Sequence, residues 1–254
     1  MLSVPAINTM SFSAREKILN EISTSIKKIL GKKILSATVY GSTLCEDFCC
    51  QSDFDILLIF ESLSFRDIEE LKKIRQFFLD RSIRVDFNIH LSGELPKIRK
   101  GAYWHNNRSL FIQKELEMYG RQIIGQNLFV ETKIYEKEMC LETVRMVNSL
   151  LYQTRKIFIN GEINCENKLK VMKFCIYAVL YSLAFVGLYP ESRKEAFQLF
   201  KKYYKTKIDP ICFFDAKVER TNEITNIDLK NALEFLGELD SKIYKLYKKK
   251  WSSE

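Results

Sequence analysis

Proline, glycine and histidine are scarce in this chain of 254 residues, which contains four prolines, nine glycines and two histidines. So few prolines and glycines leave no low-complexity linker, and the sequence shows no internal repeat. No apolar run reaches the roughly 18 uninterrupted residues of a membrane helix, and residues 174–189 are expected to form a buried helix instead. The first residues lack the basic and apolar regions of a signal peptide, so we expect a cytoplasmic protein.

Cysteine is present, but in no disulfide pattern: the seven cysteines are odd in number and irregularly spaced. Cys45, Cys49 and Cys50 form a cluster, yet no histidine follows at the spacing of a zinc finger. We expect free, reduced thiols, with a metal or redox role of the cluster as the alternative.

The charge balance is modestly basic, with 40 Lys and Arg residues against 32 Asp and Glu residues and a net charge of +8. Such an excess suits a phosphate-rich ligand. It does not by itself indicate nucleic acid, because no dense basic stripe accompanies it.

Three acidic residues follow a glycine turn in the first third of the chain. Gly41 and Ser42 end an apolar stretch, a spacer of ten residues leads to Asp53, and Asp55 follows two positions later. Asp86 lies in the next apolar stretch. Asp53 and Asp55 share one face of a strand, and Asp86 joins them if its strand is a neighbour. Clustered carboxylates repel one another, and a divalent cation such as Mg²⁺ is the usual reason to keep them together.

An alternative is that Asp53 and Asp55 are simply exposed residues at the start of an edge strand. The continuous apolar run of residues 56–60 favours a strand buried on both faces. The turn before it offers backbone N–H groups, expected at a helix N-terminus, that can hold phosphate oxygens.

The pattern formed by Gly41, Ser42, Asp53, Asp55 and Asp86 resembles the signature of the DNA polymerase beta-like nucleotidyltransferase superfamily. The resemblance implies transfer of a nucleoside monophosphate, AMP from ATP, with release of pyrophosphate. It also implies that the three aspartates are the catalytic and magnesium-binding residues. Gly41 and Ser42 would then hold the phosphates of the nucleoside triphosphate.

The chain departs from this family in residues 43–52, which contain two acids and no base. Many relatives carry an arginine or lysine shortly after the Gly-Ser turn. Triphosphate binding would then depend on magnesium, on backbone amides and on a base from elsewhere in the chain. A catalytically inactive protein that binds nucleotide or a partner is therefore the alternative function.

The pattern of apolar residues predicts an α+β nucleotidyltransferase domain over residues 1–130, a small mixed sheet with helices, and an all-α bundle over residues 131–254. In the first domain we expect helices at 12–30, 64–80 and 105–119, a strand at 34–40 and strands containing Asp55 and Asp86. In the second we expect four helices, at 133–159, 167–186, 192–204 and 226–249.

The predicted bundle resembles HEPN-type helical domains. Both histidines, His90 and His105, precede it, so the Arg-His motif of HEPN ribonucleases is absent. The bundle is expected to bind the acceptor substrate, to form a homodimer, or to serve a structural role. By analogy with aminoglycoside enzymes, Glu138 and Glu142 are candidate general bases, although a solvated helix face explains them as well. The histidines could contact phosphate, or act as caps or surface residues.

Three acceptors are compatible with the sequence. The length and the order of the two domains favour a small hydroxylated molecule such as an aminoglycoside. A protein hydroxyl is the second, by analogy with nucleotidyltransferase–HEPN pairs. An RNA 3′ end is the third, disfavoured by the modest charge.

Overall fold

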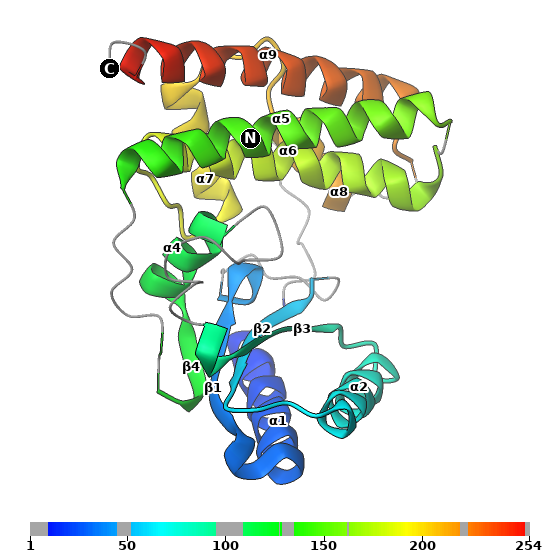
Figure 1. The fold of residues 1–254 in the computed structure, drawn as a ribbon. Coiled ribbons are helices and arrows are strands. Elements are labelled where there is room, and N and C mark those ends of the chain that lie inside the picture. Colours follow the sequence, from blue (N-terminus) through cyan, green and yellow to red (C-terminus); the bar gives the residue numbers. More distant parts are fainter. Residues whose placement is uncertain are drawn as a thin grey trace. The chain divides into compact units, whose positions relative to one another are not determined.

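The computed structural model describes residues 10–44, 52–94, 109–126, 128, 135–161, 163–218 and 223–251. The chain divides into two compact units, Met1–Lys133 and Ile134–Glu254. The first unit combines a sheet with helices, and the described residues of the second form helices and their connections, without a strand (Figure 1). This confirms the predicted fold class, an α+β unit followed by a helical bundle.

The first unit contains one mixed sheet of four strands in the order β3-β2-β1-β4. Strand β1 is antiparallel to both of its neighbours, whereas β2 and β3 are parallel. The elements follow one another as α1 (Phe12–Leu30), β1 (Ile34–Tyr40), β2 (Phe54–Phe60), α2 (Phe65–Leu79), β3 (Val85–Leu91), α4 (Ser109–Tyr119) and β4 (Arg121–Gly125). Three short 3₁₀ segments connect them, Gly31–Lys33, Gly41–Leu44 and Ser92–Glu94.

Strand β2 is the centre of this unit, because apolar side chains pack against both of its faces. Phe54, Ile56 and Leu58 belong to a core that includes the buried residues of α1 and α2. Leu57 and Ile59 point to the opposite face and pack with Ile112 and Leu116 of α4. The strand is therefore internal, as the apolar run predicts, and the exposed edge-strand interpretation is wrong.

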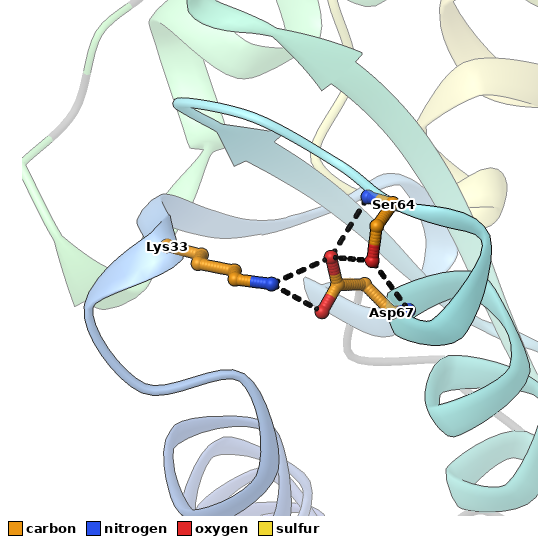
Figure 2. A network of polar contacts seen from close by, with 3 residues as sticks. All are labelled: Lys33, Ser64 and Asp67. Carbon is orange, nitrogen blue, oxygen red and sulfur yellow. Dashed lines mark hydrogen bonds and ion pairs between the residues drawn. The ribbon is translucent and has the colours of Figure 1, made fainter.

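Helix α2 begins at a polar network that ties it to the segment before β1 (Figure 2). Ser64 caps the helix, and its hydroxyl and backbone N–H both donate to Asp67 Oδ2, at 2.6 and 2.8 Å. Lys33 Nζ lies 2.8 Å from Asp67 Oδ1 and 2.9 Å from Oδ2. These contacts lower the pKa of Asp67, the Lys33 hydrogen bond most of all. The helical period predicts that Ile68 is buried, but Ile68 is 44% exposed and Asp67 is buried instead.

The second unit has five described helices. They are α5 (Glu136–Ile159), α6 (Cys165–Phe185), α7 (Arg193–Tyr203), α8 (Ile211–Val218) and α9 (Asn226–Trp251). The long helices α5, α6 and α9 pack against one another (Figure 1). Helix α8 is absent from the sequence prediction, which has four helices here. No helix in the described parts of the chain is both long enough and apolar enough to cross a membrane.

Candidate active site

The sheet places two of the three predicted aspartates side by side. Asp55 of β2 is the register partner of Asp86 on the parallel strand β3, so their side chains leave the sheet on the same face. Asp53 directly precedes β2, and its place on that face, expected from the alternation of an extended chain, stays a prediction. Asp53 and Asp55 are half-buried, and Asp86 is exposed. The sequence predicts that Asp86 joins the other aspartates if its strand is a neighbour of theirs, and β2 and β3 are neighbouring strands.

The glycine turn lies directly against this group of carboxylates. Tyr40, the last residue of β1, pairs with Asp55, so the chain leaves the sheet beside that residue. Gly41 has a φ of +69°, a left-handed conformation that side chains disfavour. A Cβ atom at Gly41 would lie 3.0 Å from Asp55 Oδ2. A side chain at position 41 would therefore crowd this carboxylate oxygen.

Residues Gly41–Leu44 form a 3₁₀ turn. The predicted helix N-terminus at Gly41 and Ser42 stays a prediction, because the residues that follow this turn lie outside the described part of the chain. Residues 45–51 lie outside the described part of the chain, and with them Cys45, Cys49 and Cys50. The four described cysteines, Cys140, Cys165, Cys175 and Cys212, form no disulfide.

Thr43 links the turn to the start of β2, a contact that the sequence prediction missed. Its side chain is 2% exposed. The hydroxyl donates to the carbonyl oxygen of Asp53 and accepts from the backbone N–H of Asp55, both at 3.3 Å. One side chain in the turn is therefore bonded to the backbone of both aspartates.

Two arginines lie at this end of the unit, and the sequence prediction missed both. Arg15, on α1, is 9% exposed and donates from Nη1 to the carbonyl oxygen of Thr43 at 3.1 Å. Arg121 begins β4, opposite Val39, and forms an ion pair with Glu16. That pairing lowers the pKa of Glu16 and raises the pKa of Arg121, in each case chiefly through their hydrogen bond. Arg15 is 28 positions from Thr43 in sequence, and only the fold brings it to the turn.

The face of β3 that carries Asp86 also carries further polar side chains. Asn88, two residues after Asp86, donates to the hydroxyl oxygen of Tyr40 at 2.5 Å. His90 is buried, and its Nδ1 lies 3.4 Å from a carboxylate oxygen of Glu94. Of the two default interpretations of His90, a cap or a surface residue, the surface position is therefore wrong, and the capping role stays a prediction. His105 lies outside the described residues.

The two glutamates considered as general bases belong to α5. Glu138 is exposed in the first turn, where its carboxylate accepts the backbone N–H of Tyr135 at 3.4 Å. Glu142 is half-buried one turn later. Glu138 thus has a local capping role that does not require catalysis.

No group of three or more His, Cys, Asp or Glu side chains is arranged to hold a metal ion within the described ranges. The magnesium site stays a prediction. The geometry does bring together Asp55, Asp86 and the Gly41 turn.

Comparisons with known proteins identify a fold but no sequence family. No family model matches the sequence, and no curated protein matches it. Among solved structures, the chain resembles a spectinomycin adenyltransferase from Enterococcus faecialis that was crystallised with ATP and spectinomycin. The TM-score is 0.58 and the sequence identity 14%, over 88% of this chain and 98% of that one. The chain therefore has the fold of a nucleotidyltransferase, built as an α+β unit followed by helices.

Proposed function

We propose that this protein is a magnesium-dependent nucleotidyltransferase that moves AMP from ATP to the hydroxyl group of an acceptor. The observation that supports this most directly is the position of Asp55, which adjoins both Asp86 and Gly41. Carboxylates beside a glycine turn offer metal ligands and phosphate-binding amides in one place. The similar adenyltransferase, crystallised with ATP, supports a nucleotide as co-substrate.

The residues present suit magnesium. Carboxylate oxygens are hard ligands, and Mg²⁺ is commonly held by one or two carboxylates together with substrate phosphates, so a closed cage of three protein ligands is not required. Asp53 and Asp55 would hold the ion, and Asp86 would complete the site. The missing side chain at Gly41 avoids crowding Asp55 Oδ2. Bound magnesium would offset the negative charge of the triphosphate and of the leaving pyrophosphate.

In the proposed reaction, the oxygen of the acceptor hydroxyl attacks the α-phosphorus of ATP. The bond from that phosphorus to the oxygen bridging to the β-phosphate breaks, and pyrophosphate leaves. As the alternative to completing the metal site, Asp86, which is exposed, accepts the proton of the hydroxyl as the new phosphoester forms. Gly41 and Ser42 orient the phosphates through their backbone amides.

A small hydroxylated molecule such as an aminoglycoside is our proposed acceptor, with a protein hydroxyl second and an RNA 3′ end third. The structural relative was crystallised with spectinomycin, which supports the first choice. The HEPN-like character of the second unit, a homodimer and a cytoplasmic location belong to the same proposal, and they rest on the sequence patterns alone.

The test of the metal site replaces single carboxylates. Asp53→Asn or Asp55→Asn should abolish magnesium-dependent pyrophosphate release from ATP, while thermal stability stays equal or rises because a like charge is removed. Asp80→Asn, which changes an exposed carboxylate after α2, is the control and should behave as the wild type. Full activity in both site variants would refute the metal assignment.

Two further measurements identify the acceptor and test the alternative that the protein is catalytically inactive. Calorimetric titration with each nucleoside triphosphate, with and without Mg²⁺, asks whether nucleotide binds at all. Mass spectrometry of reactions containing ATP and spectinomycin, protein or RNA then identifies the molecule that gains AMP. Binding without any modified acceptor or released pyrophosphate would support a nucleotide-binding protein that retains the fold.

A further inference from the structure

A buried arginine lies beneath the phosphate-binding turn. The buried side chains of α1 include one stripe, formed by Arg15, Leu19, Ile22, Ile26 and Leu30. The last four belong to the apolar core, whereas the first is a guanidinium at the end nearest to Thr43. A charged group is costly to bury without hydrogen bonds, so its bond to the Thr43 carbonyl indicates a specific placement.

Thr43 continues this connection to the aspartates. Arg15 holds the carbonyl of Thr43, and the hydroxyl of the same residue holds the backbone of Asp53 and Asp55. The three hydrogen bonds form a continuous path from α1, through the glycine turn, to the strand that carries the carboxylates. A shift of the turn relative to β2 would require breaking the Thr43 hydroxyl bonds.

We propose that Arg15 and Thr43 are positioning residues, which fix the distance between the amides of the Gly41 turn and the carboxylates of Asp53 and Asp55. This inference rests on the proposed function, because that distance matters only if both groups hold one magnesium–nucleotide complex. The pair need not touch the nucleotide. Its effect is to keep two halves of the site in register before the ligand arrives.

The experiment measures binding of a nonhydrolysable ATP analogue with Mg²⁺ by calorimetry, using the full chain. Thr43→Val keeps the shape of the side chain and removes the hydroxyl, and it should weaken binding by about five- to tenfold. Thr43→Ser restores the hydroxyl and should return affinity to within about twofold of the wild type. Arg15→Met keeps an unbranched apolar stem and should weaken binding in the same direction as Thr43→Val.

A matched control separates positioning from general stability. Thr154→Val removes another buried threonine hydroxyl, one that donates to Leu150 within α5 at 2.9 Å. It should lower thermal stability without changing nucleotide affinity. Melting curves for every variant show that each is folded at the temperature of the titration.

The two proposals fail in different ways. A wild-type chain that binds no magnesium–nucleotide complex refutes the proposed function, and the positioning inference falls with it. A wild-type chain that binds, with Thr43→Val binding equally well, refutes the positioning inference alone. Weak binding by both Thr43→Val and Thr43→Ser would likewise overturn the role of the hydroxyl.

Discussion

Gly41 is restricted by two separate properties of its position. Its φ of +69° costs any other L-residue about 1–2 kcal/mol. The space where a Cβ would lie is bounded by Asp55 Oδ2, at 3.0 Å. Gly161 has nearly the same φ, +67°, but a Cβ there would meet nothing within 4 Å. The two glycines therefore have similar backbone conformations, but only at Gly41 would a Cβ atom meet another side chain.

This difference gives a direct prediction. Gly41→Ala and Gly161→Ala should each lower the free energy of unfolding by about 1–2 kcal/mol, because both force alanine into a left-handed conformation. Gly41→Ala alone should also weaken magnesium–nucleotide binding by about tenfold or more, since the new methyl group displaces the Asp55 carboxylate, and tenfold equals about 1.4 kcal/mol. Chemical denaturation and calorimetry measure the two effects. Equal nucleotide affinity in both variants would contradict the contact argument.

Helix α2 shows how one charged residue sets the start of an element. Asp67 accepts from Ser64 at the helix N-terminus and pairs with Lys33 before β1 (Figure 2). These contacts favour the charged carboxylate, so the folded-state pKa of Asp67 lies below its unfolded value of about 3.9. A depressed pKa stabilises the fold above the unfolded pKa, and that stabilisation is lost as the pH falls through the folded pKa.

Asp67→Asn should therefore reduce the free energy of unfolding at pH 7. The difference in this free energy between the wild type and the variant should become smaller below about pH 4. Chemical denaturation at pH 7, 5, 4 and 3 measures this difference in free energy of unfolding. Glu69→Gln, in the same helix, removes only an exposed pair with Lys72 and should change stability by less than about 0.5 kcal/mol. A gap for Asp67→Asn that is independent of pH would show that its charge is not the stabilising feature.

The chain consists of two compact units, and each has its own packed side chains. In the second unit, Phe235 is fully buried, and its ring centroid lies 5.9 Å from that of Phe200 and 5.2 Å from that of Phe213. These three rings connect α7, α8 and α9. The packing explains why the short α8 forms at all, because eight residues are too few for a stable isolated helix.

Phe235→Ala should destabilise the second unit by about 3–5 kcal/mol, since it removes a buried ring and leaves a cavity. Tyr152→Ala, in which the lost ring is 64% exposed, should change stability by less than about 0.5 kcal/mol. Scanning calorimetry and helical circular dichroism report both changes. Similar melting curves for the two variants would contradict the assigned core.

Local patterns predicted the first helix and strand, α1 at Phe12–Leu30 and β1 at Ile34–Tyr40, with the observed bounds. Their periodicity and end signals lie within the segments themselves. The same reasoning missed α8 and placed Ile68 rather than Asp67 inside, because packing partners distant in sequence determine both outcomes.

The candidate site likewise combines features that the sequence predicts with contacts that only the fold determines. Gly41, Ser42 and the three aspartates are recognisable from spacing, because a glycine turn and alternating acids are local properties of the chain. The pairing of Asp55 with Asp86, and the approach of Arg15 to Thr43, depend on strand order and helix packing. Those contacts join residues up to 31 positions apart, and local propensity carries no information about which distant segments will meet. The sequence thus specifies the chemical groups, and the folded sheet determines which of them become neighbours.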